Sequence, residues 1–118
     1  MELGKLFGNN TAAMTLIFLA RYEEASVGEI SAAFDIPKTQ IYLQLLKLED
    51  AGIVSSRELG NMRIYFFNPR SPIKNELRAL LEKYIEINMP IEKYKNFYLI
   101  RRRARRRGKA LGGVYKNE

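Results

Sequence analysis

The feature that most constrains this chain is a three-residue break, Asp35-Ile36-Pro37, between two stretches with helical patterns. Before the break, Ser26-Val27-Gly28-Glu29 matches a capping box, in which the serine hydroxyl and the glutamate carboxylate satisfy the first free amides of a helix. This predicts a short helix that ends at Phe34. Proline disfavours a helical residue before it and suits the first helical position after it, so another helix is expected to begin near Pro37.

The helix after the break has an apolar face. Ile41, Leu45 and Leu48 recur at the spacing of helical turns, and Ala51-Gly52 supplies a C-terminal stop. Two helices joined by a turn of three residues are typical of a helix-turn-helix.

Further elements surround this pair. An apolar stripe over residues 11–22 predicts a helix in front of it. Ile53 to Glu58 and Arg63 to Asn68 have the composition of strands, joined by a Gly-Asn turn that suits a β-hairpin. Ser71 as N-cap and Pro72 as first helical residue predict a helix to about Asn88, and the segment from Ile91 to about Leu111 could also be helical. The order predicts a mainly α fold with a small β-hairpin, a winged helix-turn-helix.

Composition allows one domain and disfavours enzyme activity. At 118 residues the chain suits one core, and we expect a winged-helix domain over 1–88 and a basic, partly helical extension over 89–118. The chain has no cysteine and no histidine, which excludes disulfides, most zinc sites and imidazole catalysis. Adjacent acidic residues such as Glu23-Glu24 diverge on a helix, so we expect no enzyme, no cofactor and no metal site.

Nothing in the sequence predicts a membrane or secreted protein. The apolar residues occur in short runs, none of which approaches the roughly 18 residues that a membrane span needs. The opening residues Met1-Glu2-Leu3-Gly4-Lys5 lack the pattern of a secretion signal. We therefore expect a cytoplasmic location.

Charge is unevenly distributed. Residues 1–90 contain ten Lys and Arg against eleven Asp and Glu, whereas residues 91–118 contain ten against two. A basic arm on a nearly neutral domain favours a polyanionic partner, because each phosphate contact releases counterions. The expected nucleic-acid arm comprises Arg101, Arg102, Arg103, Arg105, Arg106 and Arg107. Two alternatives are a solvated, partly disordered tail and an amphipathic segment on an anionic membrane.

The helix-turn-helix and hairpin segments resemble a known family. The segments that carry the resemblance are Val27 to Phe34, Ile41 to Val54, Gly60 to Pro69 and Ser71-Pro72-Ile73. They are similar to ArsR-like winged helix-turn-helix transcription regulators, and especially to the winged helix domains that precede nucleotidyltransferase domains in longer proteins. The resemblance covers residues 5–82, about two thirds of the chain. It implies that the helix after Pro37 enters the DNA major groove, that the hairpin touches the minor groove or backbone, and that the first and last helices build a dimer.

Two departures limit this resemblance. Metal-sensing members place cysteines in the second helix, where this chain has Val27-Gly28-Glu29, so a thiolate metal switch is excluded. The family also commonly has arginine where this chain has Leu43, which leaves one expected major-groove contact without its usual side chain.

The exposed side of the helix after Pro37 offers residues that suit base recognition. Glutamine can bond bidentately to adenine, lysine can reach guanine or a phosphate, and threonine can contact a thymine methyl group. The candidates for DNA binding are Lys38, Thr39, Gln40, Tyr42, Gln44 and Lys47. The alternative is that any amphipathic helix exposes some polar residues.

Polar residues also flank the hairpin turn. Cationic side chains placed there can enter a narrow minor groove, so Arg57, Asn61 and Arg63 are further candidates for DNA binding. The alternative is that their charges protect an edge strand from pairing with another sheet.

The predicted helix that ends at Asn88 has a wider apolar face than a small core needs, and Leu3, Leu6 and Phe7 add apolar surface. Such surface favours association. The expected homodimer interface comprises Leu6, Phe7, Leu77, Leu81, Tyr84 and Ile85. In the extension, Tyr94, Phe97 and Tyr98 are expected to pack or to join the dimer rather than to stack on bases.

These observations predict a homodimeric regulator that binds double-stranded DNA and represses transcription. A two-fold dimer places two recognition helices about one DNA turn, ~34 Å, apart and predicts a near-palindromic site. One alternative is a winged-helix module that binds a separately encoded protein such as a nucleotidyltransferase, which the nearly neutral first ninety residues favour. Another is RNA binding through the arginine run. The sequence predicts neither the site's base sequence nor a small-molecule effector.

Overall fold

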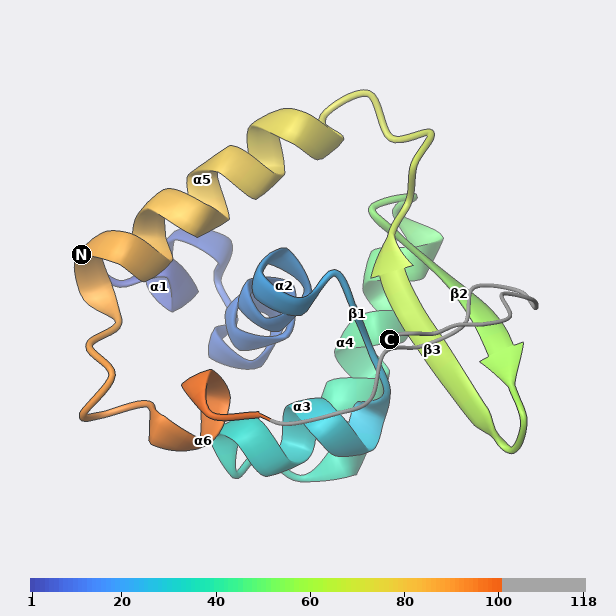
Figure 1. Ribbon diagram of the computed structural model, residues 1–118. Coiled ribbons are helices and arrows are strands. Elements are labelled where there is room, and N and C mark those ends of the chain that lie inside the picture. The colour runs from blue at the N-terminus through green and yellow to red at the C-terminus, as the bar shows by residue number, and fades with distance from the viewer. Residues whose placement is uncertain (101–118) are drawn as a thin grey trace, which may run out of the picture.

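The computed structural model of the protein describes residues 1–100, which form six helices and three strands. The elements are α1 (Leu3–Phe7), α2 (Asn10–Tyr22), β1 (Glu24–Ala25), α3 (Val27–Phe34), α4 (Lys38–Asp50), β2 (Val54–Leu59), β3 (Met62–Phe67), α5 (Lys74–Asn88) and α6 (Lys95–Tyr98). The other helices surround α2, and the hairpin of β2 and β3 projects to one side (Figure 1). Within the described part of the chain, no helix combines the length and apolar character needed to cross a bilayer.

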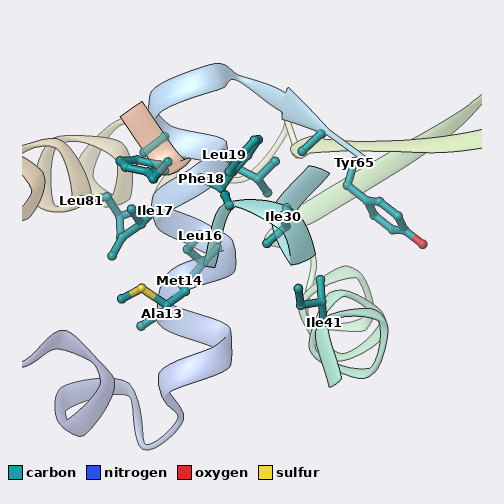
Figure 2. Packing of buried hydrophobic residues seen from close by; sticks show 14 of the residues in the cluster. Ala13, Met14, Leu16, Ile17, Phe18, Leu19, Ile30, Ile41, Tyr65 and Leu81 are labelled. Atoms are coloured by element: carbon teal, nitrogen blue, oxygen red, sulfur yellow. The ribbon is translucent and has the colours of Figure 1, made fainter. Parts of the chain in front are cut away.

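The central helix of the core is α2. Every residue from 13 to 20 is buried, because neighbouring elements cover the helix on all sides. Figure 2 shows Ile30 of α3 and Ile41 of α4 on one side of α2 and Leu81 of α5 on the other. The helix predicted over 11–22 is thereby confirmed.

The predicted hairpin forms, and a third strand joins it. β2 and β3 pair antiparallel as far as Leu59 opposite Met62. Gly60 takes a φ of 62°, the left-handed conformation that the two-residue turn requires. β1 pairs with the other edge of β3, which gives the strand order β1-β3-β2. The sequence pattern does not predict β1, because two residues are too few to show an alternation.

α3 and α4 meet at the predicted three-residue turn. The capping box is present: the Glu29 amide donates to the Ser26 hydroxyl at 3.2 Å, and the Ser26 amide donates to the Glu29 carboxylate at 2.9 Å. Asp35 turns the chain with a φ of 55°. Pro37 caps α4 rather than being its first helical residue, because its carbonyl accepts the first helical hydrogen bonds.

The structure also differs from the sequence prediction for the last two helical segments. α5 begins at Lys74, two residues after Pro72. Pro72 instead lies in a turn in which the Lys74 amide donates to the Ser71 carbonyl at 3.2 Å. In the segment from 91 to about 111 that could be helical, the helix up to residue 100 is confined to the four residues of α6, and residues 101–111 lie outside the described residues.

The short helix α1 is absent from the sequence prediction. Its Leu3 is fully buried, and Gly8 ends the helix with a φ of 77°. Leu3 therefore belongs to the core and adds nothing to exposed apolar surface, contrary to expectation. Leu6 on the same helix is exposed.

An aromatic cluster packs residues 89–100 against α2 and α3. Phe97 is fully buried, stacks on Phe34 at 5.2 Å between ring centroids and meets Phe18 edge-on at 6.1 Å. The Tyr22 hydroxyl donates a hydrogen bond to the Phe97 carbonyl. Phe97, which is expected to pack or to join a dimer, packs inside the protomer. The first part of the predicted extension thus shares the core of the preceding domain.

Phe97→Ala is expected to lower the free energy of unfolding by about 3–5 kcal/mol, the usual cost of deleting a buried aromatic side chain. Urea unfolding followed by circular dichroism measures the change. Leu99→Ala is the matched control, because Leu99 is 64% exposed and only two residues away. Its effect should stay within about 0.5 kcal/mol. Equal losses in the two variants would show that Phe97 does not anchor this segment.

Candidate nucleic-acid interface

The packing of α4 fixes which of its residues face outward. Ile41 and Leu45 are fully buried. Because a helix turns about 100° per residue, Leu43 lies about 180° from them, at the centre of the outer face. Of the six residues of α4 that are predicted to bind DNA, only Gln44 is partly buried. The exposed ones are Lys38, Thr39, Gln40, Tyr42 and Lys47.

Two leucines on this outer face are missing from the predicted site. Leu43 is 54% exposed and Leu46 is 41% exposed. Both fall outside the regular apolar spacing of Ile41, Leu45 and Leu48. That mismatch with the buried stripe is the sequence signal that identifies them as surface residues.

Charge along α4 changes from one end to the other. From Lys38 to Lys47 the helix contains two lysines and no acidic residue, whereas Glu49 and Asp50 end it. The Ser56 hydroxyl of β2 donates to the Glu49 carboxylate at 2.8 Å. The exposed surface of α4 therefore has a lysine at each end of an uncharged stretch and is acidic only at the end that meets the sheet.

A shallow hollow separates α4 from the hairpin. Lys38 and Tyr42 of α4 line it together with Met62 and Arg63 of β3. Tyr65 also lines it, and its hydroxyl points away from the core cluster (Figure 2). Burial raises the pKa of Tyr65, and the nearby Glu49 raises it further, so this hydroxyl keeps its proton at neutral pH. Cationic side chains and a protonated phenol can all donate hydrogen bonds to an anion.

The three hairpin residues predicted to bind DNA have different surroundings. Asn61 and Arg63 are exposed near the turn, and the Arg63 guanidinium donates to the exposed Glu58 carboxylate at 3.0 Å. Arg57 instead pairs with the buried Glu24 carboxylate of β1 at 3.2 Å. The structure thus uses Arg57 to join two strands of the sheet, a role that the sequence does not reveal.

The residues predicted for the dimer interface also separate into two sets. Leu81 is fully buried and Ile85 nearly so, which leaves them almost no surface for a second copy. The accessible ones are Leu6, Phe7, Leu77 and Tyr84. The six arginines of the predicted arm, between 101 and 107, lie outside the described residues. Within residues 1–100, no group of three or more His, Cys, Asp or Glu is placed to hold a metal ion.

Comparison with known proteins identifies the family. A family model described as the sugar-specific transcriptional regulator TrmB matches residues 9–73, more than half of the chain. The chain belongs to the TrmB family. The match includes α2, α3, α4 and the hairpin, and it ends before α5. This TrmB-family chain is also 32% identical over 84 residues to the HTH-type transcriptional regulator YuzN of Bacillus subtilis (strain 168), covering 66% of the chain and 90% of YuzN.

Two solved structures share the fold of this TrmB-family chain. Reduced HlyU from Vibrio cholerae N16961 aligns with a TM-score of 0.59 at 23% identity, over 75% of this chain and 86% of HlyU. The apo form of a ZitR mutant from Lactococcus lactis aligns with a TM-score of 0.54 at 17% identity, over 77% of this chain and 75% of ZitR. These likenesses confirm the predicted winged helix-turn-helix fold.

The resemblance to ArsR-like regulators is confirmed for the winged-helix fold and for transcription regulation. The family model that matches is TrmB, and the narrower ArsR-like assignment stays a prediction. The descriptions of the TrmB family and of YuzN are those of transcription regulators rather than enzymes.

Arg57→Ala is expected to destabilise the fold. Removing the guanidinium breaks its 3.2 Å pair with a buried carboxylate and should lower the free energy of unfolding by about 1–3 kcal/mol in urea titrations. Arg63→Ala is the control, because its partner Glu58 is exposed and such surface pairs are worth at most about 1 kcal/mol. If Arg57→Ala costs no more than Arg63→Ala, Arg57 does not join the strands as described.

Proposed function

We propose that this protein binds double-stranded DNA sequence-specifically as a homodimer and represses transcription by occupying a promoter. The observation that carries the proposal is the outer face of α4, which is exposed, has two lysines and no acidic residue from Lys38 to Lys47, and is held in place by the buried Ile41 and Leu45. The position of α4 directly after the helix-turn-helix bend supports this role. Membership of a family of transcriptional regulators supports it as well.

In this proposal α4 enters the major groove with its first turns toward the base edges. Gln40 suits bidentate bonding to adenine, whereas Lys38 and Lys47 suit guanine or a phosphate. The first ten residues of α4 contain no acidic side chain that would repel the phosphates. Glu49 and Asp50 favour an approach in which the far end of the helix stays away from the DNA backbone.

The hollow between α4 and β3 suits the sugar-phosphate backbone beside the groove. Lys38 and Arg63 border it, and both can donate charge-assisted hydrogen bonds to phosphate oxygens. The surface pair between Arg63 and Glu58 is weak enough for a phosphate to replace it. In this proposal the exposed Asn61 at the turn contacts the adjacent minor groove. Arg57 has no direct part in this proposal, because it is paired within the sheet.

The arginine run adds affinity that does not depend on base sequence. It places six arginines in seven positions, from 101 to 107, directly after the described residues. Each phosphate that an arginine neutralises releases condensed counterions, so this part of the binding weakens steeply with salt. Base preference then depends on α4, while the arm raises affinity for all duplexes.

A stripe on α5 supports a second copy of the chain as partner. The α5 stripe consists of the N-cap residue Ile73 and of Leu77, Leu80, Tyr84 and Ile87 within the helix, at alternating steps of four and three residues. This is the spacing of a coiled-coil seam. None of the five is fully buried, and three of them are exposed large hydrophobic residues. The α5 stripe runs beside the face that packs into the core, so α5 can pack inward and against a second α5 simultaneously.

Two-fold symmetry connects this interface to DNA recognition. A dimer would present two α4 helices to successive turns of the major groove, ~34 Å apart. Two copies of one face read the same sequence on opposite strands, which favours a near-palindromic site. In this proposal the bound dimer occupies a promoter, and repression is the mode of action that follows from that occupancy.

One observation favours a different function. Leu43 and Leu46 give the centre of the outer face an apolar character that is unusual beside so many polar residues. Exposed apolar groups with a polar rim also mark protein-protein interfaces. The second candidate function is therefore a protein-interaction module whose α4 binds a separately encoded partner such as a nucleotidyltransferase.

Selection of duplexes from a random DNA pool tests the first proposal. We expect a near-palindromic consensus. Deleting the residues after Ile100 should lower affinity for selected and random duplexes by the same factor. It should also reduce the slope of log affinity against log salt by about 0.9 for each phosphate that the arm no longer neutralises. Fluorescence anisotropy at several salt concentrations measures both effects. If no duplex is enriched and the full chain binds only protein or RNA, the proposal is overturned.

Leu80→Glu is expected to convert the dimer to a monomer, because it places a charge in the middle of the α5 stripe. Size-exclusion chromatography with light scattering measures the mass. Ala79→Glu is the matched control, because Ala79 is accessible on the same helix but lies away from the stripe. A dimer that tolerates Leu80→Glu, or a wild-type chain that is monomeric at micromolar concentration, would contradict this interface.

A further inference from the structure

We propose that Leu43 and Leu46 recognise the methyl groups of neighbouring thymines. This inference rests on the proposed DNA binding, and it adds residues that determine base preference. The observation behind it is that two leucines are exposed on the outer face of α4, Leu43 at its centre and Leu46 beside it, among the polar candidates Gln40 and Lys47.

The orientation of the two leucines follows from the packing of α4. Ile41 and Leu45 are fixed in the core, so Leu43 points directly away from it and Leu46 lies on the same outer face. A helix that enters the major groove brings its outer face deepest into the groove. Leu43, 54% exposed, is then at the centre of the face that meets the base edges, and Leu46, 41% exposed, lies to one side of that centre.

Base edges in the major groove offer one apolar group to such side chains. Guanine, adenine and cytosine present hydrogen-bond donors and acceptors there, whereas thymine adds its C5 methyl group. A leucine that meets a donor or acceptor covers it without supplying a partner, which is unfavourable. A leucine that meets the methyl group buries two apolar surfaces, which is favourable. The leucines therefore favour thymine and disfavour the other bases.

Spacing indicates that the two thymines are close together. Three residues of helix span about 4.5 Å, from Leu43 to Leu46. Successive bases on a DNA strand are separated by about 3.4 Å. The two leucines can therefore contact the same base pair or two adjacent base pairs, but not distant ones. Thr39 continues the outer face by one turn and carries a methyl group of its own. A half-site with two neighbouring thymines at its centre fits this arrangement.

The charges around the leucines favour DNA over an apolar protein surface as their occupant. Lys38 and Lys47 lie on the same helix, and Arg63 lies across the hollow. Between Lys38 and Lys47 there is no acidic residue to offset them. An apolar protein partner would have to desolvate these cations, whereas the phosphates on both sides of the groove pair with them.

Replacing thymine with deoxyuridine tests the proposal, because deoxyuridine lacks only the C5 methyl group. The probe is the duplex recovered from the random pool, with the central thymines of each half-site replaced one at a time. For the wild-type chain, each replacement that removes a contacted methyl group should weaken binding by about threefold to fivefold. Replacements outside the half-sites should leave the dissociation constant unchanged.

The leucine variants complete a double-mutant cycle. Leu43→Ala and Leu46→Ala should bind the thymine duplex about as weakly as wild type binds the deoxyuridine duplex, and each should be insensitive to one replacement. Leu99→Ala, another exposed leucine, should keep the full methyl effect. Unfolding curves check that all the variants remain folded.

The outcomes separate this inference from the proposed function. Enrichment of a duplex whose affinity is unaffected by every deoxyuridine replacement would overturn thymine recognition and leave DNA binding intact. A methyl effect that persists unchanged in both leucine variants would also overturn it. If no duplex is enriched, the proposed DNA binding fails, and the inference fails with it.

Discussion

The burial of α2 is the constraint on which the rest of the structure depends. Because residues 13–20 are all inside, each neighbouring element must offer an apolar face to this one helix. Ile30, Ile41 and Leu81 supply such faces from α3, α4 and α5. Each neighbour is thereby fixed in rotation about its own axis. For α4, the residues that complete the core also determine which side chains remain outside, so stability and the proposed recognition of DNA depend on the same packing.

Much of the fold is predictable from the sequence because it is specified locally. The capping box at Ser26, the break at Pro37 and the Gly60 turn each act within a few residues, and α3, α4 and the hairpin occur where these signals indicate. β1 and α6 are not predictable in this way. β1 exists because β3 offers a free edge, and α6 is positioned by the burial of Phe97, so both depend on contacts between distant parts of the chain.

The same distinction applies to the candidate site. The sequence does not distinguish Arg57 from Arg63, because both are arginines in the strands that flank the hairpin turn. Strand pairing separates them, because β1 brings Glu24 to Arg57, whereas Arg63 stays near the exposed turn. Leu81 likewise has the residue type and helical position expected of an interface residue, but it is fully buried in the core of the protomer. Residue type and spacing identify the candidates, and tertiary packing determines which of them remain available to a partner.

Anchoring Phe97 between α2 and α3 has a kinetic consequence. Phe97 is packed against Phe34 of α3 only four residues before Arg101, so chain length alone limits how far from the helix-turn-helix the arginine run can begin. In the proposed binding mode, once one of the two parts has engaged a long anionic polymer, the other meets it at an effective concentration in the millimolar range, as short tethers provide. Dissociation then requires both parts to release together, which would lengthen the residence time without any increase in the affinity of either part alone.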